Sequence, residues 1–255
     1  MSKCHKIVLI KFYDKWKAIR FTFAPNFLKS LYLMKKFFLN AFVIAGLGLA
    51  VTGCKDNNKE AEMAETKEAA TAETEAREFK VDTASSIIEW KGEKPTGTHT
   101  GTIKVAEGSF MANDSVVESG TFVIDMESIK VTDLEGEEKT NLEAHLKGTV
   151  EGKEGDFFNV TEYAEATFEV TGVTEEEGQS MLQGNLTIKE ETKNITFPVN
   201  ISQNGDSIEI TSEEFTIDRT KWNVNYGSKS VFDGLGDKFI NDDISLKINL
   251  KANKA

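Results

Sequence analysis

The sequence contains little cysteine and little histidine, and these shortages exclude several classes of protein. Two cysteines and three histidines in 255 residues are too few for a disulfide scaffold or a zinc ribbon. The chain has 42 acidic and 30 basic residues and a net charge of −12, so no basic face is available and no nucleic-acid partner is expected. HxH, HExxH and GxSxG motifs are also missing. We therefore expect no metal site, no catalytic residues and no cofactor.

Positive charge is concentrated at the amino terminus. Residues 1–53 hold nine lysines and arginines and a single acid, Asp14, which leaves −20 for the rest of the chain. Within this basic part, Met34, Lys35 and Lys36 precede the apolar run FFLNAFVIAGLGLA. A basic start, a short apolar run and small residues at its end indicate a signal peptide over 34–53. The run is shorter than the roughly 20 residues that a membrane-spanning helix needs.

The signal peptide ends in VTGC, which places Cys54 directly after the apolar run. This ending resembles a bacterial lipobox, and the resemblance implies that Cys54 is acylated and anchors the protein to a membrane. A secretory signal with a chance cysteine is the alternative. Residues 1–33 are interpreted as an upstream extension of a chain that starts at Met34, or else as a true amphipathic extension. We expect a lipid-anchored protein of the cell envelope, at the outer membrane facing the periplasm, with the cell surface as the other option.

The stretch after Cys54 is acidic and contains no aromatic and no β-branched aliphatic residue up to residue 78. Such a composition cannot bury enough apolar surface to offset the entropy of ordering the chain. Residues 54–78 are therefore predicted to be a lipidated cysteine followed by a disordered acidic tether.

From residue 79 onward, apolar and polar residues alternate with a period of two. Phe122, Ile124 and Met126, for example, alternate with Val123 and Asp125. One apolar and one polar face indicate antiparallel sheet, and about eight such runs occur, separated by Gly and Asx turns. Such strands close into a barrel or pack as a sandwich, and periodicity does not separate the two. The stretch NLEAHLKG interrupts the alternation and predicts one short helix near 137–148.

Several segments, taken in order, are similar to one family. These segments are EAHLKG…DFFNV, ATFEVTGV, GNLTIKEETKNITFPV and FTIDRTKWNVNYGS, and they resemble the YceI-like family of polyisoprenoid-binding proteins. The resemblance implies that residues 79–255 form an all-β, antiparallel, lipocalin-like barrel of about eight strands. It also implies an apolar cavity for an isoprenoid lipid of the quinone or polyprenyl type. The chain departs from the family pattern at Leu142 and Glu143, where Arg-Asp is usual, in the charged insertion 148–155, and at 189–192.

The resemblance and the alternation together nominate the residues of the site. Polar contacts to a lipid head group are assigned to His99, His145 and Arg219; Arg219 forming an ion pair with Asp218 or another acid is the alternative. Adjacent phenylalanines in a strand would point to opposite faces, so only one of Phe157 and Phe158 is expected in the cavity. The expected cavity residues are Trp90, Phe110, Phe122, Ile124, Met126, His145, Leu146, Phe157, Phe158, Phe168, Leu186, Ile188, Phe197, Phe215, Ile217 and Trp222.

Three functions are compatible with these residues. The first is non-catalytic binding, storage or transport of an isoprenoid lipid. The second is an envelope enzyme that acts on such a lipid through His145 or His99. The third is a structural lipoprotein whose barrel is filled by side chains. The oligomeric state is left open, with a homodimer as one option.

Overall fold

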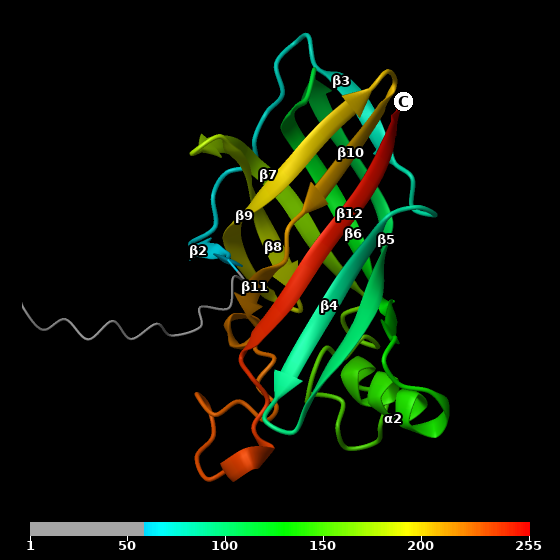
Figure 1. Cartoon of the computed structure of the whole chain (residues 1–255), viewed down its shortest axis with the longest axis vertical. Helices are drawn as coiled ribbons and strands as arrows, with labels where there is room; N and C mark the ends of the chain where they lie inside the picture. Colours follow the sequence, from blue (N-terminus) through cyan, green and yellow to red (C-terminus); the bar gives the residue numbers. More distant parts are fainter. Residues whose placement is uncertain (1–58) are drawn as a thin grey trace, which may run out of the picture. The chain divides into compact units, whose positions relative to one another are not determined.

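The computed structural model describes residues 59–255, shown in Figure 1. The upstream segment 1–33, the signal peptide 34–53 and Cys54 lie outside the described residues, so the expectations about them stay predictions. The described residues form a compact unit of their own. The strands are β1 (Lys59–Glu60), β2 (Glu62–Ala64), β3 (Arg77–Val81), β4 (Ile87–Lys94), β5 (Gly97–Asn113), β6 (Val116–Val131), β7 (Glu165–Glu176), β8 (Gln179–Ile188), β9 (Glu191–Asn204), β10 (Ser207–Ser212), β11 (Phe215–Asp218) and β12 (Asp243–Lys254).

Eight strands close into a barrel, as predicted. Strands β4, β5, β6, β7, β8, β9, β10 and β12 pair in this order, and β12 pairs back with β4. Every pairing in this ring is antiparallel. Two walls of the ring are interrupted: β3 continues the line of β4 along β12 and β5, and β11 continues the line of β10 along β12. Closure removes most of the unpaired edges that an open sheet would expose.

The barrel interior holds the main core, as the alternation of the strands requires. In β12, for example, Ile244, Leu246, Ile248 and Leu250 pack inward between polar neighbours. At one level of the barrel a belt of rings passes from strand to strand, with neighbouring ring centroids 4.4–6.3 Å apart. Stacked and tilted ring pairs of this kind add to the stability that burial gives. The belt consists of Phe79, Phe110, Phe122, Phe168, Phe197 and Phe215.

The expectation of a disordered tether is wrong for the described part of residues 54–78. Strand β1 pairs in parallel with β11, and β2 pairs antiparallel with the first half of β9. Between them Ala61 is 3% exposed and packs in the main core, and its N–H donates to Thr216 O at 2.9 Å. Further along, Lys67 and Asn185 exchange two hydrogen bonds. The physical reason is that β9 and β11 diverge after β10 ends, and their free edges offer backbone hydrogen bonds to an extended segment even where its composition does not favour strand.

The predicted helix near 137–148 is confirmed as α2, Gly136–Lys147. Acids Glu137 and Glu138 occupy its first turn and Lys147 its last, which suits the helix dipole. It ends at Gly148, whose φ of 70° is left-handed, and a Cβ there would lie 2.5 Å from Glu154 O. Within residues 59–255, no helix has the length and apolar content that crossing a membrane would require.

Candidate functional site

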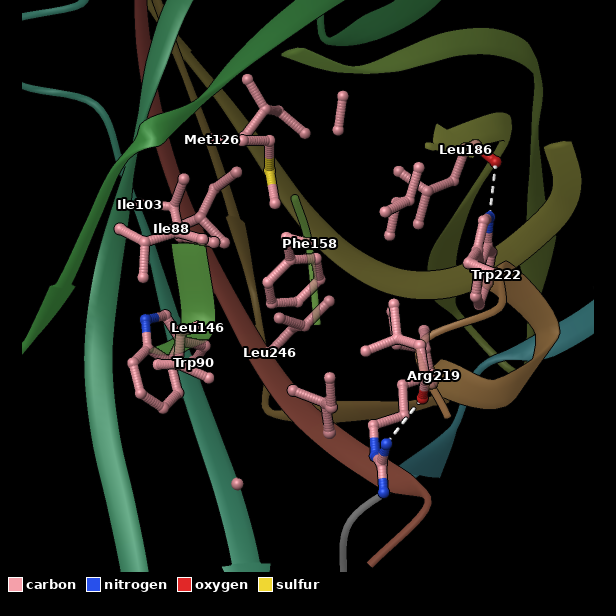
Figure 2. A pocket seen from close by; sticks show the side chains of 18 of the residues that line it. Ile88, Trp90, Ile103, Met126, Leu146, Phe158, Leu186, Arg219, Trp222 and Leu246 are labelled. Atoms are coloured by element: carbon pink, nitrogen blue, oxygen red, sulfur yellow. Dashed lines mark hydrogen bonds between the residues drawn. The ribbon is translucent and has the colours of Figure 1, made fainter. Parts of the chain in front are cut away.

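The barrel encloses a cavity of about 440 Å³, in the usual size range for small-molecule sites. Its wall is built by inward side chains of nine strands, and residues of α2 and of the connection between β11 and β12 line its mouth at one end. Figure 2 shows Trp90, Leu146 and Phe158 projecting toward the space that Met126 and Leu246 border. Because these side chains are apolar, the cavity suits an apolar ligand.

Nearly all of the residues expected in the cavity line it, and so do His99, His145 and Arg219. Phe110 is the exception. Its ring stacks between Phe79 and Phe122 at centroid distances of 5.7 and 6.0 Å, beyond the end of the cavity. The expected opposition of Phe157 and Phe158 is also wrong. Both line the cavity because they lie in a loop, where the period of two of a strand does not apply.

Sequence reasoning missed about half of the lining. The alternation in β12 would have identified its four inward residues, because it is the same signal that identified the other strands. The mouth residues have no such signal, since they lie in loops or at strand ends. The missed residues are Ile88, Gly92, Glu93, Lys94, Ile103, Val105, Ile129, Leu142, Ala166, Leu182, Ile195, Ile210, Val224, Tyr226, Lys238, Ile240, Asn241, Ile244, Leu246, Ile248 and Leu250.

Two tryptophans face the cavity from opposite parts of the wall. Trp222 is fully buried in the 3-10 helix η1 (Arg219–Trp222), and its Nε1 donates to Leu186 O at 3.0 Å, as Figure 2 shows. Trp90 lies on β4 beside Gly101 of β5, where a Cβ would lie 2.4 Å from its ring. Its Nε1 is buried and has no hydrogen-bond partner among the described residues. Trp222 is thus held in place by the protein, whereas Trp90 retains an unused donor.

Helix α2 covers the mouth and is fixed at both sides. Glu143 Oε1 accepts a hydrogen bond from the Val131 N–H at 2.9 Å, which ties the helix to β6. At the other side, Phe158 N donates to Leu146 O at 3.2 Å. Glu143 stands where the family pattern usually has an acid after arginine, and here its carboxylate serves to attach the helix. We conclude that α2 is an anchored cover of the cavity.

His145 extends from α2 into a cluster of rings at the mouth. Its Nε2 lies 2.7 Å from Asp156 Oδ2, which follows the charged insertion 148–155. Its ring contacts Phe157 and Tyr226 edge to face, with centroids 5.1 and 5.0 Å away. These contacts join α2 to the loop that follows it and to the distant segment at Tyr226, and they fix the orientation of the His145 ring at the mouth.

His99 forms the second histidine–carboxylate pair of the cavity. Its Nδ1 lies 2.8 Å from Asp133 Oδ2, and the Thr100 N–H donates to Asp133 Oδ1 at 2.8 Å. Burial acts to raise the pKa of the Asp133 carboxyl, but the Thr100 N–H and His99 outweigh it and hold this pKa below its usual value. The carboxylate is therefore charged at neutral pH and orients the imidazole at the cavity mouth.

Arg219 is buried, with an exposed fraction of 3%, and its guanidinium is used within the protein. It donates to the carbonyls of Val224, Ile240 and Asn241 at 2.6, 3.1 and 3.0 Å. Its Nη2 also lies 3.7 Å from Asp242 Oδ1. Burial lowers the pKa of Arg219, and Asp242 opposes this shift. The acid that pairs with Arg219 is therefore Asp242, while Asp218 caps η1 through the Thr220 N–H.

The polar groups at the mouth do not form a metal site. Among residues 59–255, no group of three or more histidine, cysteine or carboxylate side chains is placed to hold an ion. Each imidazole is hydrogen-bonded to one carboxylate instead. The chemistry that this arrangement offers is shape, apolar surface and a few oriented polar groups at one end.

A closed antiparallel barrel around an apolar cavity defines a class of proteins that enclose lipid-like ligands. The profile of the YceI-like domain matches residues 79–252, which is most of the chain. The chain belongs to the YceI-like domain family.

Solved structures share this fold. BcnA of Burkholderia cenocepacia is similar with a TM-score of 0.54 and 22% identity, over 68% of this chain and 99% of that chain. A polyisoprenoid-binding domain from Saccharophagus degradans, implicated in plant cell wall breakdown, is similar with a TM-score of 0.50 and 13% identity, over 69% of this chain and 98% of that chain. Comparison with the curated proteins gave no match.

Proposed function

We propose that this protein binds an isoprenoid lipid, of the quinone or polyprenyl type, in the cavity of its barrel without catalysing a reaction. The observation that carries the proposal is the enclosed cavity of about 440 Å³, whose walls are formed mainly by aliphatic and aromatic side chains. The family to which the chain belongs and the polyisoprenoid-binding domain that shares its fold support the same ligand class. The presence of a cavity argues against a barrel filled by side chains.

The energetics suit a carrier or a reservoir. Transfer of one five-carbon isoprene unit from water to an apolar site contributes about 4 kcal/mol, at roughly 0.8 kcal/mol per carbon. A bilayer provides nearly the same gain, so exchange between the protein and a membrane is close to balanced. Preference among lipids must then come from the shape of the cavity and from the polar groups at the mouth, His99, His145 and Lys238 among them.

The cellular location that we propose is inferred from the amino-acid sequence. Acylation at Cys54 would keep the barrel at the cell envelope, at the outer membrane facing the periplasm, with membrane lipids within reach. Fatty-acid labelling of cells that express the whole chain, followed by fractionation, tests this setting. The Cys54→Ser chain should lose both the label and the membrane association; a label that persists in this variant would contradict the proposal.

The ligand itself is tested by extraction and by uptake. Residues 56–255 would be secreted, purified without detergent and extracted with organic solvent for mass spectrometry. The purified unit would then be offered geranylgeraniol and a short-chain ubiquinone, with an unbranched alcohol of equal carbon number as the control. A bound isoprenoid near one per protein supports the proposal. An empty unit that takes up neither probe would contradict it.

A matched pair of variants shows whether the ligand occupies the cavity. Ala166 on β7 lines the cavity and is 4% exposed, whereas its neighbour Thr167 faces the other side of the wall. Ala166→Phe fills space that the ligand needs and should lower uptake about tenfold or more, while Thr167→Phe should leave uptake unchanged. Unfolding midpoints of both variants establish that each one folds. Equal uptake by both folded variants would place the ligand elsewhere.

The enzyme alternative rests on the two histidine–carboxylate pairs, which resemble the base–acid pairs of catalysts. The secreted and purified unit of residues 56–255 also tests this alternative. Incubation with a polyprenyl phosphate or ester and analysis of the products should show unchanged lipid. Turnover that disappears in His145→Ala or His99→Ala, with binding intact, would favour an enzyme.

A further inference from the structure

Exposed large hydrophobic residues are few in the described part of the chain, and most of them lie in one connection. Of Val116, Tyr226, Val231 and Phe232, the last three lie between η1 and β12. Val231 and Phe232 are adjacent and are 47% and 49% exposed. Single exposed hydrophobic residues are ordinary, but an adjacent exposed pair in one loop marks a candidate contact surface. We call residues 228–240 the mouth loop.

The mouth loop is held in shape, so this exposure belongs to the fold. The Ile240 N–H donates to Gly227 O at 2.8 Å and closes the loop at its base. Gly227 has a left-handed φ of 66°, and a Cβ there would lie 3.2 Å from Ile240. Next to the exposed pair, the Phe232 N–H donates to Ser228 O at 2.9 Å. Little further ordering is then needed to present the two side chains to a partner.

Arg219 attaches the base of the loop to the barrel. Its guanidinium binds carbonyls on both sides of the mouth loop: that of Val224 before it, that of Ile240 at its last residue and that of Asn241 after it. The Ser230 hydroxyl donates to Asp242, the acid that faces Arg219. These contacts give Val231 and Phe232 a definite position relative to the barrel.

The loop borders the cavity mouth. Lys238 and Ile240 of the loop, and Tyr226 and Asn241 beside it, line the cavity. The Asn241 N–H donates to Glu93 O at 2.8 Å and joins this region to the end of β4. In Figure 1 the loop, drawn in orange, lies at the same end of the barrel as α2 and the β4–β5 hairpin. A surface that contacts Val231 and Phe232 would therefore face the opening of the cavity.

The charge of the mouth loop indicates which kind of partner surface it contacts. The whole chain carries −12, and the described part is more acidic still. The mouth loop is balanced, with Lys229 and Lys238 against Asp233 and Asp237. It therefore offers apolar contact without a charge that would attract an acidic or a basic protein. Anionic lipids would be repelled by the rest of the barrel rather than attracted by the loop.

We infer that the mouth loop inserts Val231 and Phe232 into the surface of a lipid bilayer and so places the cavity opening against the membrane. The bilayer is the partner that fits, because it accepts apolar side chains and is the source of the ligand that we propose for the adjoining cavity. The contact itself does not require that ligand; only the passage of ligand through it rests on the proposed function. Insertion through apolar side chains should favour zwitterionic over anionic lipid.

Vesicle flotation with residues 56–255 tests the inference, since this unit contains the whole barrel. The wild-type unit should float with phosphatidylcholine vesicles, and less with vesicles containing phosphatidylglycerol, with added salt reducing the difference. The Val231→Ser/Phe232→Ser double variant should bind about tenfold more weakly, as expected for losing two half-exposed apolar contacts. The control is Val116→Ser, which removes an exposed hydrophobic residue at the β5–β6 turn, at the other end of β5 from the mouth. Unfolding midpoints should agree among all three proteins.

Several outcomes would overturn the inference. One is a wild-type unit that does not float with phosphatidylcholine. Another is equal binding by the double variant, or an equal loss in Val116→Ser. A third is a wild-type unit that dimerises but does not bind vesicles, together with a double variant that is monomeric. This result would assign Val231 and Phe232 to self-association.

Ligand delivery separates this inference from the proposed function. Geranylgeraniol would be supplied either in detergent micelles or in phosphatidylcholine vesicles. The double variant should take it up normally from micelles and about tenfold more slowly from vesicles. Failure of the wild-type unit to take it up from either source counts against the ligand. Equal rates from vesicles for the wild type and the double variant count against the docking surface.

Discussion

Replacing Arg219 by alanine is expected to destabilise the barrel by about 3–5 kcal/mol, the usual cost of removing one partner from a buried charged network. The substitution leaves three carbonyls, of Val224, Ile240 and Asn241, without their donor. It also leaves the Asp242 carboxylate facing an empty site. Each charge-assisted hydrogen bond contributes about 1.5–3 kcal/mol, and the desolvation of the guanidinium offsets part of their sum.

Urea unfolding of the wild-type and Arg219→Ala units measures this difference. Arg219→Lys should recover only part of the loss, because an ammonium cannot reproduce the planar arrangement of donors that three carbonyls use. The matched control is Lys221→Ala two residues away, an exposed cation whose contact to Asp218 at 3.3 Å should contribute less than about 1 kcal/mol.

The experiment also decides between the two roles that the sequence allowed for Arg219. A structural role predicts lower stability and a displaced mouth loop. A head-group role predicts weaker binding of a polar-headed isoprenoid with stability nearly unchanged. A loss of less than about 1 kcal/mol in Arg219→Ala, together with weaker binding of a short-chain ubiquinone, would refute the structural reasoning.

Three further predictions concern other parts of the barrel. Ala61→Asp places a charge among core side chains and should cost about 2 kcal/mol or more in urea unfolding; no change would mean that β1 and β2 do not pack as described. Gly101→Ala puts a Cβ 1.9 Å from Lys130 O and 2.4 Å from the Trp90 ring, so it should cost about 1–3 kcal/mol, and a neutral result would contradict the close packing of β4 on β5. The pKa of Asp218 lies below its usual value, because the Thr220 hydroxyl and N–H outweigh the effect of burial. Its stabilisation is therefore complete above about pH 4 and is lost as pH falls through the folded-state pKa. Between pH 5 and pH 3 the free energy of unfolding should fall less in Asp218→Asn than in the wild type, and equal slopes would count against this assignment.

The sequence by itself determined the fold class and nearly half of the cavity wall. Alternation of apolar and polar residues with a period of two indicates which side of a strand is apolar. In a closed barrel that side faces inward. Phe122, Ile124 and Leu186 could therefore be assigned to the inward face without knowledge of their neighbours, and all three line the cavity. The helix was also recognisable, because EAHLKG breaks the alternation and Gly148 supplies the left-handed residue at its end.

Only the tertiary structure decided what pairs with what. The composition of the segment 59–64 gives no sign of strand, yet the free edges of β9 and β11 hold it through backbone hydrogen bonds. The choice of Asp242 over Asp218 as the partner of Arg219 depends on where β12 begins. In the same way, the loop at Phe157 and Phe158 turns both rings into the cavity. Periodicity reports the face of a residue, whereas the neighbours of a strand are set by hydrogen bonds between segments that are distant in the sequence.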